Sequence, residues 1–269
     1  MATVISFVNQ KGGVGKTTSV INVGAALAQT IATEKRILII DMDPQANSSQ
    51  IYASISDDDA SIYNLLIQYT EINTQAGTNS ISSLKQSTYI DKLDILPSNV
   101  LLSSAEVDLV HAHGRETILK RILNDHPEFT SRYDMILIDC QPSLGLLTIN
   151  SMIASDYVVV PLKADVFSLT GLELLTNTVS KLQKVFEIDT TIAGFFFTEA
   201  NQQESMFKES FKLCKENYGS LLFDTFISNS VAIDHANAMG QSIIDFDSGN
   251  SAAQDYINLA NELVEKVRR

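Results

Sequence analysis

Short apolar runs alternate with more polar stretches along the chain, and most of the runs are continuously hydrophobic. Such runs predict β-strands covered on both faces, since a half-exposed strand would alternate apolar and polar residues. We predict strands at 3–9, 36–43, 93–97, 133–140, 156–162, 191–198 and 222–228. Apolar residues between them recur at helical spacing and predict helices at 16–30, about 100–124, about 145–154, 168–186, 204–217 and 250–268.

The order of these elements indicates the fold class. Strands that alternate with helices are typical of βαβ crossovers, which place neighbouring strands parallel. We therefore expect an α/β fold with a mainly parallel sheet and helices on both of its faces. The polar stretch 70–92 is interpreted as a surface excursion, and no linker or repeat divides the chain. A single domain over residues 1–269 is the prediction.

Composition is ordinary for a globular protein, with 45% hydrophobic and 19% charged residues. No apolar run approaches the ~20 residues that span a bilayer, and the chain starts without the basic segment of a secretory signal. Its two cysteines, Cys140 and Cys214, have neither metal-binding nor redox-motif spacing. We therefore expect a reducing, cytoplasmic location.

The segment 9–18, NQKGGVGKTT, follows a predicted strand and opens a predicted helix. This is the context of a phosphate-binding loop, in which glycines let backbone N–H groups converge on phosphate oxygens and the helix N-terminus adds positive charge. The usual spacing requires a glycine where Gln10 stands, and the loop has an extra lysine instead. The candidate nucleotide-binding residues here are Lys11, Gly12, Gly13, Val14, Gly15, Lys16, Thr17 and Thr18.

The loop makes the expected fold that of a P-loop NTPase. Lys16 would reach the β- and γ-phosphates, and the Thr17 hydroxyl would bind Mg²⁺. Thr18 is a candidate contact of the α-phosphate. Adenine is usually bound by a loop after a late strand, so 198–202, which includes Asn201, and 226–230 are candidates.

Two predicted strands end in aspartates, at the edge of the sheet where open α/β folds bind nucleotides. Asp139 follows four apolar residues, as expected for a carboxylate that holds Mg²⁺ through water. Asp41 and Asp43 are two residues apart and face one side of an extended strand. Asp43 is interpreted as the residue that orients or deprotonates the attacking water, because the strand gives way there to an expected flexible loop, 44–49. Asp41 would support that loop and the metal's water shell.

Other polar residues carry weaker signals. His111 and His113 are two apart on a predicted helix and point away from each other, which favours ordinary surface histidines over a metal site. Lys163, just past a predicted strand, is interpreted as facing solvent or a partner, although a nucleotide contact is an alternative.

The net charge is −13, so any DNA-binding surface must be a local basic patch on an acidic body. Lysines recur at helical spacing in two predicted helices, and basic residues also end the chain. These lysine stripes are either solvated helix faces or, with the terminal residues, a surface for non-specific DNA. The residues are Lys181, Lys184, Lys208, Lys212, Lys215, Lys266, Arg268 and Arg269.

Taken together, the loop and the aspartate strands resemble the ParA family of partition ATPases, which have a deviant Walker A motif. The resemblance runs along nearly the whole chain. Its segments are NQKGGVGKTT (9–18), ILIIDMDPQANSS (37–49), ILPSNVLLSSAEVDL (95–109), YDMILIDCQPSLGLLT (133–148), VVVPLKADVFSLTGL (158–172) and AQDYINLANELV (253–264). The chain is similar to the short, Soj-like subgroup, since the first strand at Thr3 leaves no room for an N-terminal helix-turn-helix.

The resemblance implies an ATPase that dimerises around ATP, binds DNA without sequence preference and hydrolyses ATP when a centromere-binding, ParB-like partner stimulates it. Lys11 matches the signature lysine that reaches the phosphates of the second subunit. Asp43 matches the aspartate associated with hydrolysis, and Asp139 matches the Walker B residue. Such a protein would be a cytoplasmic homodimer associated with the nucleoid through DNA.

The chain departs from the family pattern at two places. The Walker B segment usually continues with two prolines, whereas Cys140 and Gln141 precede a single Pro142 here. A family arginine near the DNA-binding surface is replaced by the run 228–230, SNS, with Asp234 close by.

Three other functions remain as alternatives. One is a MinD-like membrane-associated ATPase or another cargo-positioning ATPase that does not act on DNA. Membrane association needs an amphipathic C-terminal helix, but the C-terminal segment carries Glu262 and Glu265 among its apolar residues and is expected to pack on the domain without a stable membrane anchor. A reductase or metal-handling ATPase of this fold needs cysteines at cluster-ligand spacing. A scaffold without nucleotide chemistry would have no use for the residues that match Walker A and Walker B.

Overall fold

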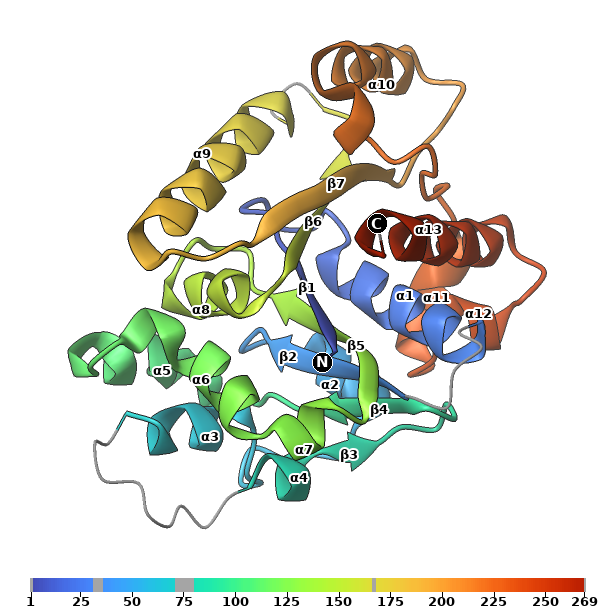
Figure 1. The fold of residues 1–269 in the computed structure, drawn as a ribbon. Helices are drawn as coiled ribbons and strands as arrows, with labels where there is room; N and C mark the ends of the chain where they lie inside the picture. Colours follow the sequence, from blue (N-terminus) through green and yellow to red (C-terminus); the bar gives the residue numbers. More distant parts are fainter. Residues whose placement is uncertain (1, 31–35, 71–79, 166–167, 269) are drawn as a thin grey trace.

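The computed structural model describes residues 2–30, 36–70, 80–165 and 168–268, and within them seven strands form one sheet (Figure 1). The strands are β1 (Thr3–Phe7), β2 (Arg36–Met42), β3 (Gln86–Ser87), β4 (Leu93–Leu96), β5 (Tyr133–Cys140), β6 (Tyr157–Lys163) and β7 (Thr191–Thr198). Their order is β3-β4-β2-β5-β1-β6-β7, and every pairing is parallel except that of β3 with β4. The predicted α/β fold of the P-loop NTPase type is confirmed.

Helices connect the parallel strands. The longer ones are α1 (Lys16–Thr30), α6 (Ile118–Asp125), α8 (Leu146–Ala154), α9 (Ser168–Phe186), α10 (Ser205–Tyr218), α11 (Val231–Ala238) and α13 (Ser251–Val267). The shorter ones are α2 (Asn47–Tyr52), α3 (Ile62–Gln68), α4 (Ile81–Leu84), α5 (Leu102–Asp108), α7 (Pro127–Thr130) and α12 (Ile243–Phe246). Three single turns of 3₁₀ helix are η1 (Leu109–His111), η2 (Arg115–Thr117) and η3 (Gly219–Leu221).

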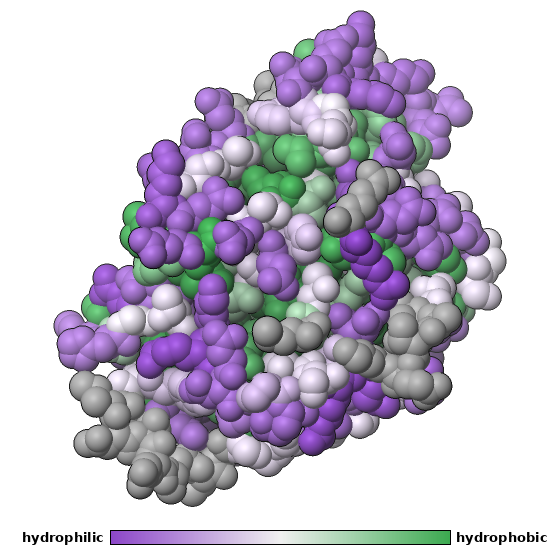
Figure 2. Space-filling model, viewed as in Figure 1, coloured by the Kyte–Doolittle hydropathy of each residue, from purple (hydrophilic) through white to green (hydrophobic). Residues whose placement is uncertain are grey.

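Two hydrophobic cores lie on opposite faces of the sheet. Figure 1 shows α6, α8 and α9 on one side and α1, α11, α12 and α13 on the other. Successive residues of β2 alternate between the two cores: Leu38 and Ile40 pack in one, and Ile37 and Ile39 in the other. This double burial explains why the strands are continuously hydrophobic. On the face drawn in Figure 2, hydrophilic side chains surround apolar ones that are visible over β6 and β7.

The predicted strand at 222–228 is wrong. Only isolated bridges form there, between Phe195 and Leu222 and between Ala200 and Ser228. Glu262 on α13 accepts hydrogen bonds from the backbone N–H groups of Asp224 and Thr225, at 2.8 and 3.0 Å. The segment divides its backbone hydrogen bonds between β7 and this carboxylate, so no continuous ladder develops.

The predicted helix at about 100–124 is also wrong as a single element. It is split into α5, η1, η2 and α6, and Gly114 breaks it with a left-handed φ of 61°. The excursion 70–92 includes α4 and β3, while residues 71–79 lie outside the described part of the chain. Elements this short give little periodicity for a sequence to reveal.

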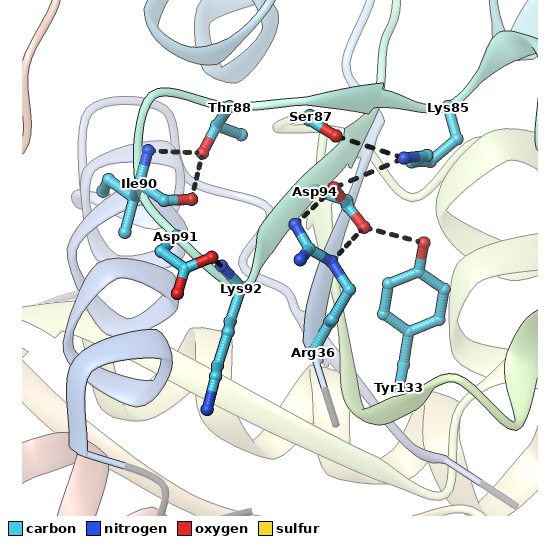
Figure 3. Close-up of polar contacts among 9 residues, drawn as sticks. All are labelled: Arg36, Lys85, Ser87, Thr88, Ile90, Asp91, Lys92, Asp94 and Tyr133. Atoms are coloured by element: carbon cyan, nitrogen blue, oxygen red, sulfur yellow. Dashed lines mark hydrogen bonds and ion pairs between the residues drawn. The ribbon is translucent and has the colours of Figure 1, made fainter. Parts of the chain in front are cut away.

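A charged cluster lies at the amino-terminal edge of the sheet, by which we mean the side where the parallel strands begin (Figure 3). Asp94 on β4 is 1% exposed, and Arg36 on β2 binds both of its oxygens at 2.7 and 2.9 Å. The Tyr133 hydroxyl on β5 donates to Asp94 Oδ2 at 3.1 Å, and Lys85 Nζ lies 3.5 Å from Oδ1. One carboxylate thus ties together three parallel strands and the residue that precedes β3.

Candidate nucleotide-binding site

The loop between β1 and α1 has the shape of a phosphate cradle. Gly13 and Gly15 have φ values of 68° and 78°, a region that side chains rarely adopt. A Cβ on Gly15 would also lie 3.3 Å from Thr198 Cγ2 at the end of β7. Thr198 Oγ1 donates to the Val14 carbonyl at 3.0 Å, so β7 forms one wall of the loop. The loop is further held by Asn9 Nδ2, which donates to the Pro161 carbonyl at 2.8 Å.

Lys16 and Thr17 begin α1 beneath this loop. Lys16 is 6% exposed, and its Nζ donates to the Lys11 carbonyl at 3.2 Å. Burial lowers the pKa of Lys16. Thr17 Oγ1 donates to Asp139 Oδ1 at 3.2 Å, which joins the two residues predicted to bind Mg²⁺.

Two buried aspartates face the loop from adjacent strands. Asp41 on β2 pairs in register with Asp139 on β5, and both are 0% exposed. Asp139 Oδ2 accepts a hydrogen bond from Ser48 Oγ at 2.7 Å, and Asp41 Oδ2 accepts from Ser49 N and Oγ at 2.9 and 2.7 Å. Burial raises the pKa of both carboxyls, and for Asp139 the charge of Asp41 adds to it.

The segment after Asp43 is more ordered than the predicted flexible loop 44–49. Asp43 is 6% exposed, and its Oδ1 accepts from Gln45 N at 2.9 Å. The chain turns at Ala46, with a left-handed φ of 54°, and α2 begins at Asn47. The bonds of Asp41 and Asp139 to Ser48 and Ser49 hold this helix against the strands, so the expectation of a flexible loop is wrong.

A cavity of about 170 Å³ opens beside the phosphate loop. It is lined by Gly15, Thr18, Thr198, Glu199, Ile227, Asn229, Ser230, Ile233, Asp234 and Tyr256. Thr198 and Glu199 come from one predicted adenine segment, and Ile227, Asn229 and Ser230 from the other. Asn201 lies outside the cavity and is exposed, with its Nδ2 3.0 Å from Glu204 Oε1. Tyr256 was not predicted, since its position in a long helix carries no sign of a ligand.

The chain matches a family model described as an AAA domain over residues 2–193. It is 38% identical to the chromosome-partitioning ATPase Soj of Treponema pallidum over 266 residues, which cover 99% of this chain and 98% of the relative. The chain belongs to the ParA family of partition ATPases. Another ParA-type relative, the sporulation initiation inhibitor protein Soj of Bacillus subtilis, is 36% identical over 264 residues, 98% of each chain. The predicted family membership is confirmed.

The ParA fold is also similar to that of a solved enzyme. Cobyrinic acid a,c-diamide synthase from Mycobacterium smegmatis, with bound ADP and magnesium, superposes with a TM-score of 0.81 and 26% identity, over 100% of this chain and 96% of that one. Within the described residues of the present chain, no helix is long and apolar enough to cross a bilayer.

The oxygen donors at the site suit Mg²⁺. No group of three or more His, Cys, Asp or Glu residues forms a metal cage in the described part of the chain. Mg²⁺ commonly takes one or two protein ligands and completes its shell with water and phosphate oxygens. Thr17 and Asp139 supply such oxygens 3.2 Å apart, beside the buried charge of Asp41. The residues present therefore fit the ion.

The Lys11 side chain points away from this site, although the Lys11 carbonyl accepts from Lys16 Nζ. Lys11 is exposed and forms an ion pair with Asp165, in the turn after β6. Lys163, the last residue of β6, pairs with Glu199 at 2.6 Å. The Lys16 side chain is thus buried and the Lys11 side chain is exposed beside Asp165, although both residues belong to one loop.

The predicted DNA-binding lysines and arginines are scattered, and several have local partners. Lys212 and Lys215 pair with Glu216 and Asp224 at 3.8 and 3.9 Å. Lys266 Nζ donates to the Ser220 carbonyl at 2.9 Å and lies 4.8 Å from the centre of the Phe223 ring, and Arg268 pairs with Asp134. Lys181, Lys184 and Lys208 are exposed, and Arg269 lies outside the described residues.

Proposed function

We propose that this chain is a Mg²⁺-dependent ATPase that dimerises on ATP, binds DNA without sequence preference and segregates plasmid or chromosomal DNA. A ParB-like centromere-binding partner stimulates hydrolysis, and the protein acts in the cytoplasm on the nucleoid. The observation that carries the proposal is the different placement of the two lysine side chains of one loop. Lys16 and Thr17 lie over Asp139, whereas Lys11 points away from them.

In this proposal ATP lies with its phosphates at the N-terminus of α1. The N–H groups of the loop and the Lys16 ammonium offset the phosphate charge. The cavity beside Thr18 takes the adenine. Thr17 and Asp139 hold Mg²⁺, which supplies further neutralisation of the transferring phosphate.

Asp43 is the proposed general base. One of its oxygens is occupied by Gln45 N, and the other accepts a proton from the attacking water. The hydrogen bond from Ser98 Oγ to the Asp43 carbonyl, at 2.9 Å, helps to fix the backbone there. A base held in this way needs little rearrangement as the water attacks.

Lys11 acts on a second subunit in this proposal. A cation that arrives from another chain stabilises charge on the transferring phosphate, as an arginine finger does. The exposure of Lys11 supports the role, and its ion pair with Asp165 must open before the lysine can cross. Dimerisation on ATP therefore joins binding in one subunit to catalysis in both.

A matched pair of lysine variants tests the proposal. Lys16→Ala should bind a fluorescent ATP analogue at least about 100-fold more weakly, because the buried phosphate contact is lost. Lys11→Ala should bind it normally as a monomer but fail to dimerise in sedimentation with ATP and Mg²⁺, and lose about 1,000-fold in turnover. An ATP-dependent dimer of Lys11→Ala with parental turnover would refute the proposal.

DNA binding is tested separately, by sedimentation with non-specific DNA in the presence and absence of ATP and Mg²⁺. Binding should require ATP and fall steeply with salt, since each phosphate contact releases a counterion. Triple replacement of the exposed lysines Lys181, Lys184 and Lys208 by alanine should weaken it. DNA binding that is independent of ATP would contradict this part of the proposal.

The alternative is a MinD-like membrane-associated ATPase, or another cargo-positioning ATPase that does not act on DNA. Membrane association is the form that the structure bears on. The apolar side of α13 argues against it, since Tyr256, Leu259 and Leu263 are buried with α1 in one core. Sedimentation with anionic liposomes, rather than with DNA, would favour the alternative.

A further inference from the structure

A single carboxylate holds both ends of the loop that follows Asp139. Glu106 on α5 accepts a hydrogen bond from Gln141 Nε2 at 2.7 Å, where this loop begins. It also accepts from the backbone N–H groups of Leu146 and Leu147, at 2.8 and 3.3 Å, where the loop ends and α8 begins. α5 and α8 are in contact (Figure 1), so the loop 141–145 is closed on Glu106.

Glu106 supplies the hydrogen-bond acceptor that the N-terminus of α8 lacks. The N-cap position of α8 is Gly145, which has no side chain to accept from the first N–H groups of the helix. A carboxylate at this place satisfies two of them and interacts favourably with the helix dipole. The close approach requires the glycine, because a Cβ on Gly145 would lie 2.3 Å from Glu106 Oε1.

The loop held by Glu106 also touches the phosphate cradle. A Cβ on Gly12 would lie 3.9 Å from Pro142 Cβ, so residues 141–145 border the part of the cradle next to Lys11. The segment that leads into α5 also contacts the residue that follows β2, because the Ser98 hydroxyl donates to the Asp43 carbonyl. Glu106 thus holds a loop that borders the phosphate cradle, and the chain that leads to its helix is bonded beside Asp43.

We propose that Glu106 is a positioning residue, which fixes the loop 141–145 against the phosphate cradle so that the loop responds to bound nucleotide as one rigid unit. This role rests on the proposed ATPase function. Gln141 is the residue through which it acts at the start of the loop. Its side-chain amide supplies the hydrogen bond that Glu106 Oε1 accepts.

The chain contains no tryptophan, so a tryptophan introduced in the loop is an unambiguous probe. Ser143→Trp places it at an exposed position. We expect its fluorescence anisotropy to be high and to change when ATP and Mg²⁺ are added. With Glu106→Gln in addition, an amide N–H₂ replaces one acceptor oxygen and opposes a donor, so anisotropy should fall and the nucleotide response should disappear.

Turnover supplies the second measurement. Glu106→Gln, without the probe, should lower kcat about 10-fold or more while KM for ATP changes less than about twofold, because the contact affects loop position and not the phosphate-binding groups. The matched control is Glu262→Gln, which also removes a carboxylate that accepts from two backbone N–H groups, those of Asp224 and Thr225. It should lower the melting temperature similarly and leave both kcat and the probe unchanged.

A double variant that exchanges the two side chains tests whether Glu106 acts through Gln141. Glu106→Gln with Gln141→Glu again places an amide opposite a carboxylate, and it should restore the probe response and bring kcat to within about threefold of the parental value. If the pair is as impaired as Glu106→Gln alone, Gln141 is not the partner that matters.

The outcomes separate the two proposals. A parental probe response and kcat in Glu106→Gln, with only the melting temperature lowered, would show that Glu106 is merely structural and overturn the inference. A protein without ATPase activity whose probe still responds to ATP, and loses that response in Glu106→Gln, would refute the proposed function and leave the positioning role standing.

Discussion

The two edges of the sheet each bury aspartates, and they satisfy them in opposite ways. At the amino-terminal edge, Asp94 is bound by Arg36 and approached by Lys85, so its negative charge is matched by cations. At the carboxyl edge, Asp41 and Asp139 lie side by side, and their hydrogen bonds come from hydroxyl and N–H groups. One edge pairs its carboxylate directly with cations, whereas the other brings two carboxylates together near the buried Lys16 ammonium.

The difference separates a charge-matched cluster from the proposed nucleotide site. A matched buried charge is compensated within the fold, so that removing one partner destabilises it, whereas neighbouring carboxylates in one buried place are held there at a cost in stability. Such a cost is common where a site must bind a cation or a charged substrate. The comparison predicts that substitutions at the two edges will affect different properties of the protein.

The largest expected effect is on catalysis at the carboxyl edge. Asp43→Ala should retain ATP binding and dimerisation but lower kcat about 100-fold, since a positioned general base contributes about 10²–10⁴. Steady-state kinetics and binding of a fluorescent ATP analogue measure the two properties. A variant that hydrolyses ATP at the parental rate would remove Asp43 from the catalytic role.

The second-largest expected effect is a loss of folding stability after a substitution at the amino-terminal edge. Asp94→Asn should lower the free energy of unfolding by about 2 kcal/mol, less than for a fully buried ion pair because Arg36 and Lys85 can turn toward solvent. Urea denaturation measures it, and ATP affinity should not change. Weakened ATP binding in this variant would mean that the two edges are not independent.

A smaller effect of opposite sign is expected for Asp139→Asn in the absence of Mg²⁺. Asparagine keeps a polar contact to the hydroxyls of Thr17 and Ser48 while removing one of two adjacent buried charges. The melting temperature measured in EDTA should rise by about 2–4 °C, equivalent to about 1 kcal/mol. A clear fall would show that the Asp139 charge stabilises the fold after all.

The smallest effect is a difference in acid sensitivity. Burial raises the pKa of Asp94, but its hydrogen bonds and ion pairs with Arg36 and Lys85 outweigh this and leave the pKa below its usual value. A lowered folded-state pKa gives stability that is present above the unfolded value of about 3.9 and is lost as the pH falls through the folded value. Unfolding followed from pH 5 downward should therefore be less pH-dependent in Asp94→Asn than in the parent. Parallel curves would exclude Asp94 as the group responsible.

Sequence alone predicted the central sheet and the first helix because long runs of buried residues leave a clear pattern. It missed β3, since two residues paired antiparallel at an edge have no period to detect. It mistook 222–228 for a strand because the apolar residues there pack beside β7 without forming its ladder. Burial is visible in a sequence, while the choice of hydrogen-bond partner is decided by tertiary contacts.

In the candidate site, too, local features could be predicted from the sequence and tertiary contacts could not. Lys16 and Asp139 were predicted from spacing, because the phosphate loop and the strand end are local features. Ser48 was not singled out, since a serine in a polar loop carries no mark of the aspartate it will bind. Glu106 was likewise not predicted as a residue of the site, because its bond to Gln141 joins segments 35 residues apart.

The contact between Thr198 and the phosphate loop affects when the loop is completed during synthesis of the chain. Its hydroxyl and the Val14 carbonyl are 184 residues apart in the chain but 3.0 Å apart in space. A nascent chain that has left the ribosome only as far as β6 carries Lys16 and Asp139 yet lacks one side of the cradle. The phosphate cradle is therefore completed only late in synthesis, after β7 has been added beside β6.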